Sequence, residues 1–241
     1  MRIVLAHGVD ESALWAFSHL RARSRDRVEL VLADALDTAT TTWTHWVDAD
    51  PARVQVRSDT GVVLRSLRAG AVLNRLMWPA NELAMVASPT DAAYAASEMR
   101  AFAMSWVRSL APIVVNAPTA QGLSGRWRTP LHWRVLGARA GLAVAPLHMS
   151  NRQPDDNDHG GGASTTILAV GGDVLHPSVP PAVRCGIRRL TTLSATTILG
   201  VRFAGTDPAA AGWQLLDATP HPDLRIGSEA GVAALERVLT P

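Results

Sequence analysis

Apolar and polar positions alternate in blocks along the first third of the chain. Apolar runs at residues 3–6 and 28–32 have the length of buried strands, and residues 11–23 between them have helical spacing. This order predicts a β-α-β opening. Alternating apolar positions on either side of Asp59-Thr60-Gly61 predict a hairpin over residues 54–64. A short apolar run at residues 71–73 predicts another strand.

The clearest helix begins at Ser88-Pro89-Thr90-Asp91, where Ser88 can cap the helix and Pro89 fits its first position. Apolar side chains at spacings of three and four then give one face to bury. These are Met99, Phe102, Ala103, Trp106 and Leu110. A strand is predicted at residues 113–115, and a second helix from Thr129-Pro130 to Gly141, whose glycine favours a helix end.

Residues 150–164 have the composition of a flexible linker, rich in Gly, Asp and Asn with nothing to bury. After it, we expect a hairpin around Gly171-Gly172-Asp173, then a helix, two strands and a last helix, at residues 183–193, 198–203, 213–216 and 228–239. The pattern predicts an α/β protein with a first domain at residues 1–149, the linker at 150–164 and a second domain at 165–241.

The chain contains no lysine, and this absence restricts the chemistry that its side chains can perform. Apolar residues make up 47% and charged residues 18%, as in ordinary globular domains, but all 23 basic residues are arginines. Schiff-base chemistry and lysine clamps on nucleotide phosphates are therefore excluded for the side chains. Arginine can bind phosphate through its planar fork, yet it is not a compact point charge. The alternative explanation is a GC-rich genome that replaces lysine codons by arginine codons.

The charge and the cysteine content indicate which kinds of partner and which cellular compartment to expect. The pI of 9.4 rests on a formal net charge of only +2, and the arginines form no run longer than Arg188-Arg189, so we expect no nucleic-acid partner. The single Cys185 cannot form an internal disulfide, which favours the cytoplasm. No signal peptide and no apolar run of membrane-spanning length are found, so we expect no membrane association.

Several segments, taken in order, resemble the ATP-grasp ligases that modify peptides. The N-terminal part resembles their pre-grasp lobe in the segment 71–79 with its Asn74-Arg75, in the long helix, in residues 114–118 and in residues 136–146. After the linker, residues 168–174 resemble the late grasp hairpin, residues 199–203 a strand that usually reads Gly-Val-Asp-Phe, and residues 216–220 the terminal Leu-Glu-x-Asn-Pro segment. The resemblance implies a pre-grasp-like α/β lobe followed by a reduced ATP-grasp-like α+β lobe.

The departures from the family decide what function the resemblance implies. The family's nucleotide-holding lysines would fall where this chain has its Gly- and Asp-rich linker, and its frequent phosphate-binding arginine falls on Thr166. Its magnesium ligands, carboxylates and an asparagine, fall on Arg202, Asp217 and Thr219. A guanidinium in a magnesium position repels the ion. We therefore expect no cofactor, no metal and no catalytic residue, and we expect Asp217 to lie near Arg202 as an ion pair or polar bridge.

Two other groups of residues could bind a partner or an ion, and the histidines could not. Trp78, Trp127 and Trp133 could line a peptide groove, since binding hot spots favour Trp and Arg, although a tryptophan at helical spacing is commonly a core residue. The loop from Gly122 to Trp127, with Arg126, could hold an anion; the alternative is an ordinary tight turn. The eight histidines show no metal-binding spacing on one helix.

Two functions follow from these observations. The first is a non-catalytic, ATP-grasp-like accessory or binding protein, cytoplasmic and able to form homo- or hetero-oligomers. It would partner an enzyme or a peptide substrate in a peptide or natural-product modification pathway. The alternative is an enzyme with a different chemistry in a cleft between the lobes. The candidate binding or cleft residues are Asn74, Arg75, Trp78, Arg126, Trp127, Trp133, Arg202 and Asp217.

Overall fold

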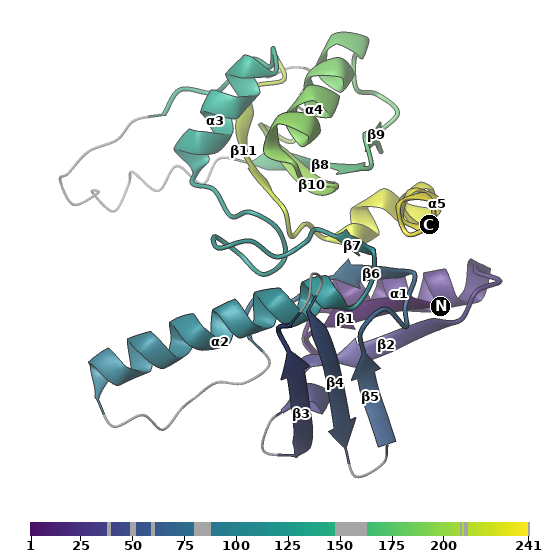
Figure 1. The fold of residues 1–241 in the computed structure, drawn as a ribbon. Coiled ribbons are helices and arrows are strands. Elements are labelled where there is room, and N and C mark those ends of the chain that lie inside the picture. Colours follow the sequence, from purple (N-terminus) through teal and green to yellow (C-terminus); the bar gives the residue numbers. More distant parts are fainter. Residues whose placement is uncertain are drawn as a thin grey trace. The chain divides into compact units, whose positions relative to one another are not determined.

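The computed structural model describes residues 1–37, 40–48, 52–58, 61–79, 88–147, 163–207, 209 and 212–240, without the side chain of Val62. It is a mixed α/β protein of two compact units (Figure 1). Unit 1 comprises Met1–Trp127 and Asp223–Pro241, and unit 2 comprises Arg128–Pro222. Among the described helices, none combines the length and apolar composition needed to cross a lipid bilayer.

A parallel four-stranded sheet forms the centre of unit 1, in the order β2-β1-β6-β7. The predicted β-α-β opening is confirmed, with the helix and the second strand at the expected residues. The elements of this layer are β1 (Arg2–Ala6), α1 (Glu11–Arg23), β2 (Val28–Leu32), η1 (Ala33–Leu36), β6 (Ala71–Asn74), α2 (Pro89–Ser109) and β7 (Ile113–Val115). Strands β1 and β6 are almost fully buried on both faces, as parallel strands covered by helices are.

A separate antiparallel sheet, in the order β3-β4-β5, completes the first part of unit 1. Its strands are β3 (Thr41–Trp46), β4 (Arg53–Ser58) and β5 (Gly61–Arg65), of which β4 and β5 form the predicted hairpin. Strand β3 was not expected from the sequence, because its only apolar side chains are the two tryptophans Trp43 and Trp46. The half-buried Trp43 packs edge-on against Phe102 and Trp106 of α2 and ties this sheet to the core.

The C-terminal residues return to unit 1 as η2 (Leu224–Gly227) and α5 (Ser228–Val238). Both elements contact α1, and Val232 and Leu235 of α5 are buried. The buried guanidinium of Arg2 in β1 donates from Nε to the carbonyl of Leu239 at 3.1 Å and from Nη2 to Oγ1 of Thr240 at 3.0 Å. The last residues are thus part of the same unit as the first strand.

Unit 2 is built on a four-stranded antiparallel sheet in the order β11-β10-β8-β9. Its elements are α3 (Pro130–Arg139), β8 (Ser164–Val170), β9 (Asp173–Val174), α4 (Pro181–Ser194), β10 (Ile198–Ala204) and β11 (Leu215–Thr219). The predicted hairpin, helix and strands are present. Strand β11 begins two residues later than Trp213, which has a left-handed backbone (φ 55°) and packs edge-on against Phe203 instead.

The division into units differs from the boundary expected at residues 150–164. Helix α3 belongs to unit 2 because it packs on β11 and α4, and α5 belongs to unit 1 because it packs on α1. Residues 150–162 of the predicted linker lie outside the described residues, and Ser164 already belongs to β8. Composition located the polar segment but not the packing of the helices before and after it.

Candidate functional site

In unit 1, the carboxyl ends of β1 and β6 form the natural position for a site. These neighbouring parallel strands are followed by connections that diverge, since the next strand after β1 is β2 on one side and the next after β6 is β7 on the other. Ligands of open α/β sheets bind at such switch points, at the carboxyl ends of the strands. The residues that follow here include His7 after β1 and the predicted site residues Asn74, Arg75 and Trp78 at the end of β6.

Asn74 is fully buried and all parts of its amide are used within the protein. Its Nδ2 donates to the carbonyls of Leu123 at 2.6 Å and Asn116 at 3.1 Å, and its Oδ1 accepts from the backbone N–H of Leu76 at 3.2 Å. Its own carbonyl accepts from the hydroxyl of Ser124 at 3.1 Å. Asn74 therefore fastens the loop after β7 to the end of β6 rather than facing a ligand.

Arg75 forms a buried ion pair with Asp10. Its Nε lies 2.9 Å from Oδ2 of Asp10 and its Nη2 lies 3.3 Å from Oδ1, and the two side chains are 3% and 9% exposed. Asp10 also caps α1 by accepting from the N–H of Ala13 at 3.0 Å. Burial lowers the pKa of the Arg75 guanidinium, and its hydrogen bond and attraction to Asp10 oppose that shift. This clamp holds the first turn of α1 against the end of β6.

Trp78 is the exposed aromatic residue at this end of the sheet. Its ring stacks on His7 with centroids 4.0 Å apart, and 45% of the residue is exposed. The Nε2 of His7 accepts from the backbone N–H of Met77 at 3.2 Å, and this bond requires a neutral ring whose proton is on Nδ1. His7 was not singled out from the sequence, although its place directly after a buried strand is a usable signal.

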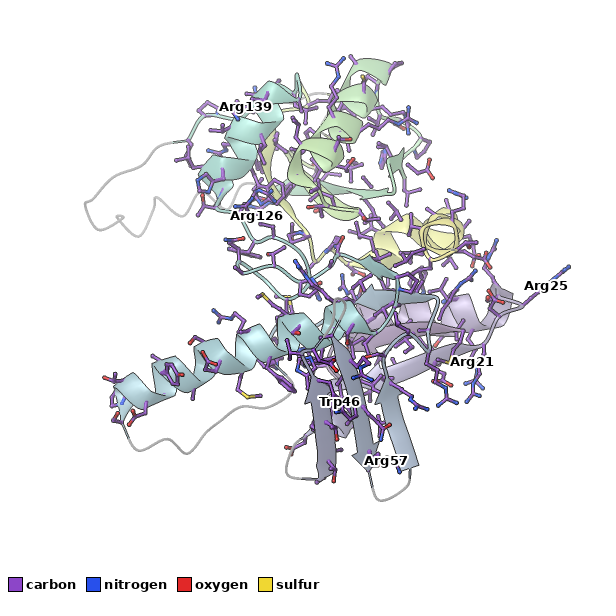
Figure 2. The ribbon with its side chains drawn as sticks, in the orientation of Figure 1. Arg21, Arg25, Trp46, Arg57, Arg126 and Arg139 are labelled. Carbon is purple, nitrogen blue, oxygen red and sulfur yellow. The ribbon has the colours of Figure 1, made fainter. Side chains whose placement is uncertain are left out.

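The glycines in the loop from Gly122 to Trp127 have the features of an ordinary tight turn. A Cβ on Gly122 would meet the carbonyl oxygen of Gly125 at 2.5 Å, and Gly125 has a φ of 97°. Arg126 of this turn, labelled in Figure 2, is exposed. The next residue, Trp127, is 57% exposed. The N-terminus of α3 is capped by the hydroxyl of Thr129, which accepts from the N–H of His132 at 3.3 Å.

Trp133 belongs to the core of unit 2 and does not line a groove. It is 1% exposed and packs among the apolar side chains beneath the antiparallel sheet, with the guanidinium of Arg128 lying 5.1 Å from its ring centroid. The sequence interpretation of Trp133 as a groove residue is corrected here. Its spacing on α3 places it on the buried face, as a core residue.

Arg202 and Asp217 of unit 2 are directly opposite each other on β10 and β11. The Nη2 of Arg202 donates to Oδ2 of Asp217 at 2.6 Å, which confirms the expected pairing. The side chains are 48% and 22% exposed, so the pair is on the surface side of the sheet. The pairing register between β10 and β11 shifts between Arg202 and Phe203.

The residues at this position do not fit a magnesium ion. Magnesium requires several hard oxygen ligands, and the one carboxylate here already accepts from a guanidinium whose charge repels a cation. Among the described residues, no group of three His, Cys, Asp or Glu side chains is arranged to hold a metal ion. Of the predicted site residues, Asn74, Arg75 and Trp78 lie together in unit 1, and Arg202 and Asp217 lie together in unit 2.

Comparison with solved structures shows what the fold resembles. The macrocyclase MdnB from Microcystis aeruginosa matches with a TM-score of 0.69 and 12% identity over 100% of both chains. The macrocyclase MdnC from the same organism, bound with its precursor peptide MdnA, matches with a TM-score of 0.68 and 10% identity over 99% of both chains. The ATP-grasp ligase PsnB, complexed with a minimal precursor, Mg and ADP, matches at 0.65 and 14% identity over 99% of this chain and 98% of that one.

Sequence comparison adds no closer relative, since neither a protein-family model nor a curated protein matches the chain. The structural similarity extends over the whole chain and includes the two-lobed α/β architecture that the sequence resemblance implied. The protein therefore has the fold of the ATP-grasp ligases.

Proposed function

We propose that this chain is a non-catalytic, ATP-grasp-like protein that binds a peptide or protein partner in a peptide-modification pathway. One observation carries the non-catalytic part. The side chains at the positions that resemble the family's magnesium site form an arginine–aspartate ion pair, with 2.6 Å between Nη2 of Arg202 and Oδ2 of Asp217. Phosphoryl transfer by this fold depends on metal ions that neutralise phosphate charge.

The absence of lysine supports the same proposal independently. A nucleotide held by this fold would have to be held by arginines, and Arg75, the arginine after β6 that resembles the family, is already paired with Asp10. Asn74 and Arg75 are buried and occupied by contacts within unit 1. They support the scaffold and not a reaction.

The peptide partner is supported by the solved structures. MdnC is bound with a precursor peptide, PsnB is complexed with its minimal precursor, and the ligase from Chryseobacterium gregarium, with a TM-score of 0.65 and 7% identity, is in complex with a leader and core peptide. A scaffold that holds a peptide for an enzyme needs that binding capacity without the chemistry. This chain would then present a peptide to an active partner enzyme.

Thermal unfolding with and without ATP and magnesium tests the non-catalytic part. A ligand present at a hundredfold its dissociation constant adds about 2.7 kcal/mol to the stability of the folded state. We expect no rise in the melting temperature of this chain with millimolar ATP and magnesium. A clear rise would overturn the proposal in favour of an enzyme that retains nucleotide.

A matched variant makes the same experiment sensitive to the ion pair. In Arg202→Asp two carboxylates are opposite each other on β10 and β11, so we expect lower stability without magnesium and partial recovery with it. The Arg202→Ala and Asp217→Ala variants, singly and together, should cost about 0 to 1 kcal/mol because the pair is partly exposed, and should not respond to magnesium. Magnesium-dependent stability of the unmodified chain that is lost in Asp217→Ala would show a surviving metal site.

A further inference from the structure

A cavity of about 1020 Å³ lies entirely within unit 1, between the edge of the parallel sheet and the edge of the antiparallel sheet. Strand β2 contributes all of its residues to the lining, and β5 contributes three. Apolar side chains from four different segments line it as well. They are Ile3, Phe17, Leu30 and Val63.

Strand β2 has one open edge within the described part of the chain. It pairs with β1 alone, and the N–H of Arg2 donates to the carbonyl of Arg27 at 2.8 Å. Backbone groups of a parallel strand point alternately to its two sides, so the N–H and C=O groups of Val28 and Leu30 point away from β1. Strand β5 is likewise an edge strand of its three-stranded sheet.

The rim of this groove carries more positive charge than the protein itself neutralises. Five arginines and two carboxylates line it, and the two carboxylates are already engaged: Glu29 with Arg27 at 2.7 Å and Asp26 with Arg2 at 3.3 Å. Within the described residues, no hydrogen bond or ion pair engages the other four guanidinium groups. They belong to Arg21, Arg25, Arg65 and Arg68, and Figure 2 shows Arg25 projecting away from the ribbon.

We propose that this groove binds an extended, acidic peptide segment as an added strand on β2. An open strand edge offers backbone donors and acceptors at the spacing of another strand, and pockets beside it receive alternate side chains. The apolar side chains receive one face of such a segment, and the four arginines complement carboxylates on its rim. The inference rests on the proposed function, because it names where and by what chemistry the peptide is held.

The two simplest alternatives explain less of the groove. Charged side chains at a sheet edge deter edge-to-edge association, but both signs serve that purpose, whereas here the carboxylates are neutralised and the arginines are not. A nucleic acid would use the arginines but has no use for strand-edge N–H and C=O groups beside apolar side chains. An acidic peptide in an extended conformation uses the arginines, the strand-edge N–H and C=O groups and the apolar side chains.

Fluorescence anisotropy with the full chain tests the inference. The probe is a labelled peptide of about eight residues that alternates glutamate with valine. We expect saturable binding that weakens as salt is raised, no binding of the lysine counterpart, and weaker binding when central valines are replaced by proline, which removes backbone donors and leaves the charge unchanged. Equal binding of the proline peptide, or of a single-stranded oligonucleotide of the same charge, would overturn strand addition.

Charge reversal locates the site. The double variants Arg21→Glu/Arg25→Glu and Arg65→Glu/Arg68→Glu change exposed side chains, and each should weaken acidic-peptide binding by on the order of tenfold or more. The control Arg139→Glu changes an exposed arginine on α3, in unit 2, and should leave binding unchanged. Undiminished binding in both double variants would reject this groove and leave the proposed function intact, whereas a rise in melting temperature with ATP would reject the non-catalytic function and leave the groove intact.

Discussion

At the scale of single residues, the carboxylate of Asp10 has two roles. It caps α1 through the N–H of Ala13 and neutralises the buried guanidinium of Arg75. Arg75 also lies 3.4 Å from the hydroxyl of Ser12, and that hydroxyl accepts from the N–H of Leu224 in η2 at 2.8 Å. Helix α1, strand β6 and the returning C-terminal segment thus share one polar cluster inside unit 1.

We expect Arg75→Met to be strongly destabilising. The substitution keeps much of the side-chain volume but leaves the carboxylate of Asp10, 9% exposed, without its charged partner. Breaking a buried ion pair by removing one member typically costs about 3–5 kcal/mol. Chemical denaturation of the variant measures the loss.

The comparison for this variant is Arg53→Met. Arg53 and Asp48 are 2.6 Å apart, but their side chains are 57% and 59% exposed. Removing such a surface pair should change stability by about 1 kcal/mol or less. Similar losses for the two variants would show that the Arg75–Asp10 pair is screened by water and does not act as a clamp.

Some residue roles were accessible from the sequence and others were not. The pairing of Arg202 with Asp217 followed from the family resemblance, because those positions share one site in the ligases. The occupation of Asn74 and Arg75 did not, since it depends on Asp10 and on the loop after β7, both distant in sequence. A candidate list from sequence cannot distinguish a polar residue that faces a ligand from one that fastens two segments.

At the scale of elements, close helix–sheet packing in unit 2 depends on a glycine. A Cβ built on Gly137 of α3 would overlap Cδ2 of Leu215 in β11, and Leu215 is fully buried. Helix α3 packs on strand β11. The glycine is present because the helix approaches the strand at this point, despite its unfavourable helix propensity.

We expect Gly137→Ala to lower stability by about 1–3 kcal/mol, because the added methyl group overfills the contact with Leu215. Helix propensity alone would give the opposite sign, by about 1 kcal/mol. The reciprocal variant Ala138→Gly, at the neighbouring exposed position of α3, should also lower stability, by about 1 kcal/mol. A stabilised Gly137→Ala would show that α3 can move away from β11 without cost.

Elements with strong local signals were predicted well. The N-cap Ser88 accepts from the N–H of Asp91 at 3.2 Å, and α2 begins at Pro89 as its capping sequence indicated. Strand β3 was missed because Thr41–Trp46 has polar residues on both faces and is an edge strand whose stability comes from packing of Trp43 on α2. The local sequence pattern predicts helix caps and turns, whereas an edge strand such as β3 depends on its packing against neighbouring elements.

At the scale of the whole molecule, each unit has its own hydrophobic core. One cluster draws its members from β1 to the loop after β7, and the other from α3 to β11. The predicted boundary followed a polar segment, but the cores follow contacts, which place α3 in unit 2 and α5 in unit 1. Sequence composition marks where a chain is polar and does not show which sheet each flanking helix will cover.

We expect residues 128–222 to fold alone, because their core is complete. A fragment of residues 1–127 should not unfold cooperatively, since it lacks the segment that covers α1 and accepts from Arg2. Circular dichroism with thermal melting checks both, and adding a peptide of residues 223–241 should restore a transition to the first fragment. A cooperative transition of residues 1–127 without that peptide would contradict the dependence on α5.

The hydrogen bond from Arg2 to Leu239 has a consequence for how the protein is made. A ribosome synthesises the amino end first, at about 5–20 residues per second, so residue 223 emerges roughly 5–20 s after residue 127. During that interval the elements of unit 2 emerge one after another, and the last of them, β11, emerges before α5 can cover α1. The part begun first is finished last, and α1 stays without its covering helix until the residues of α5 have been synthesised.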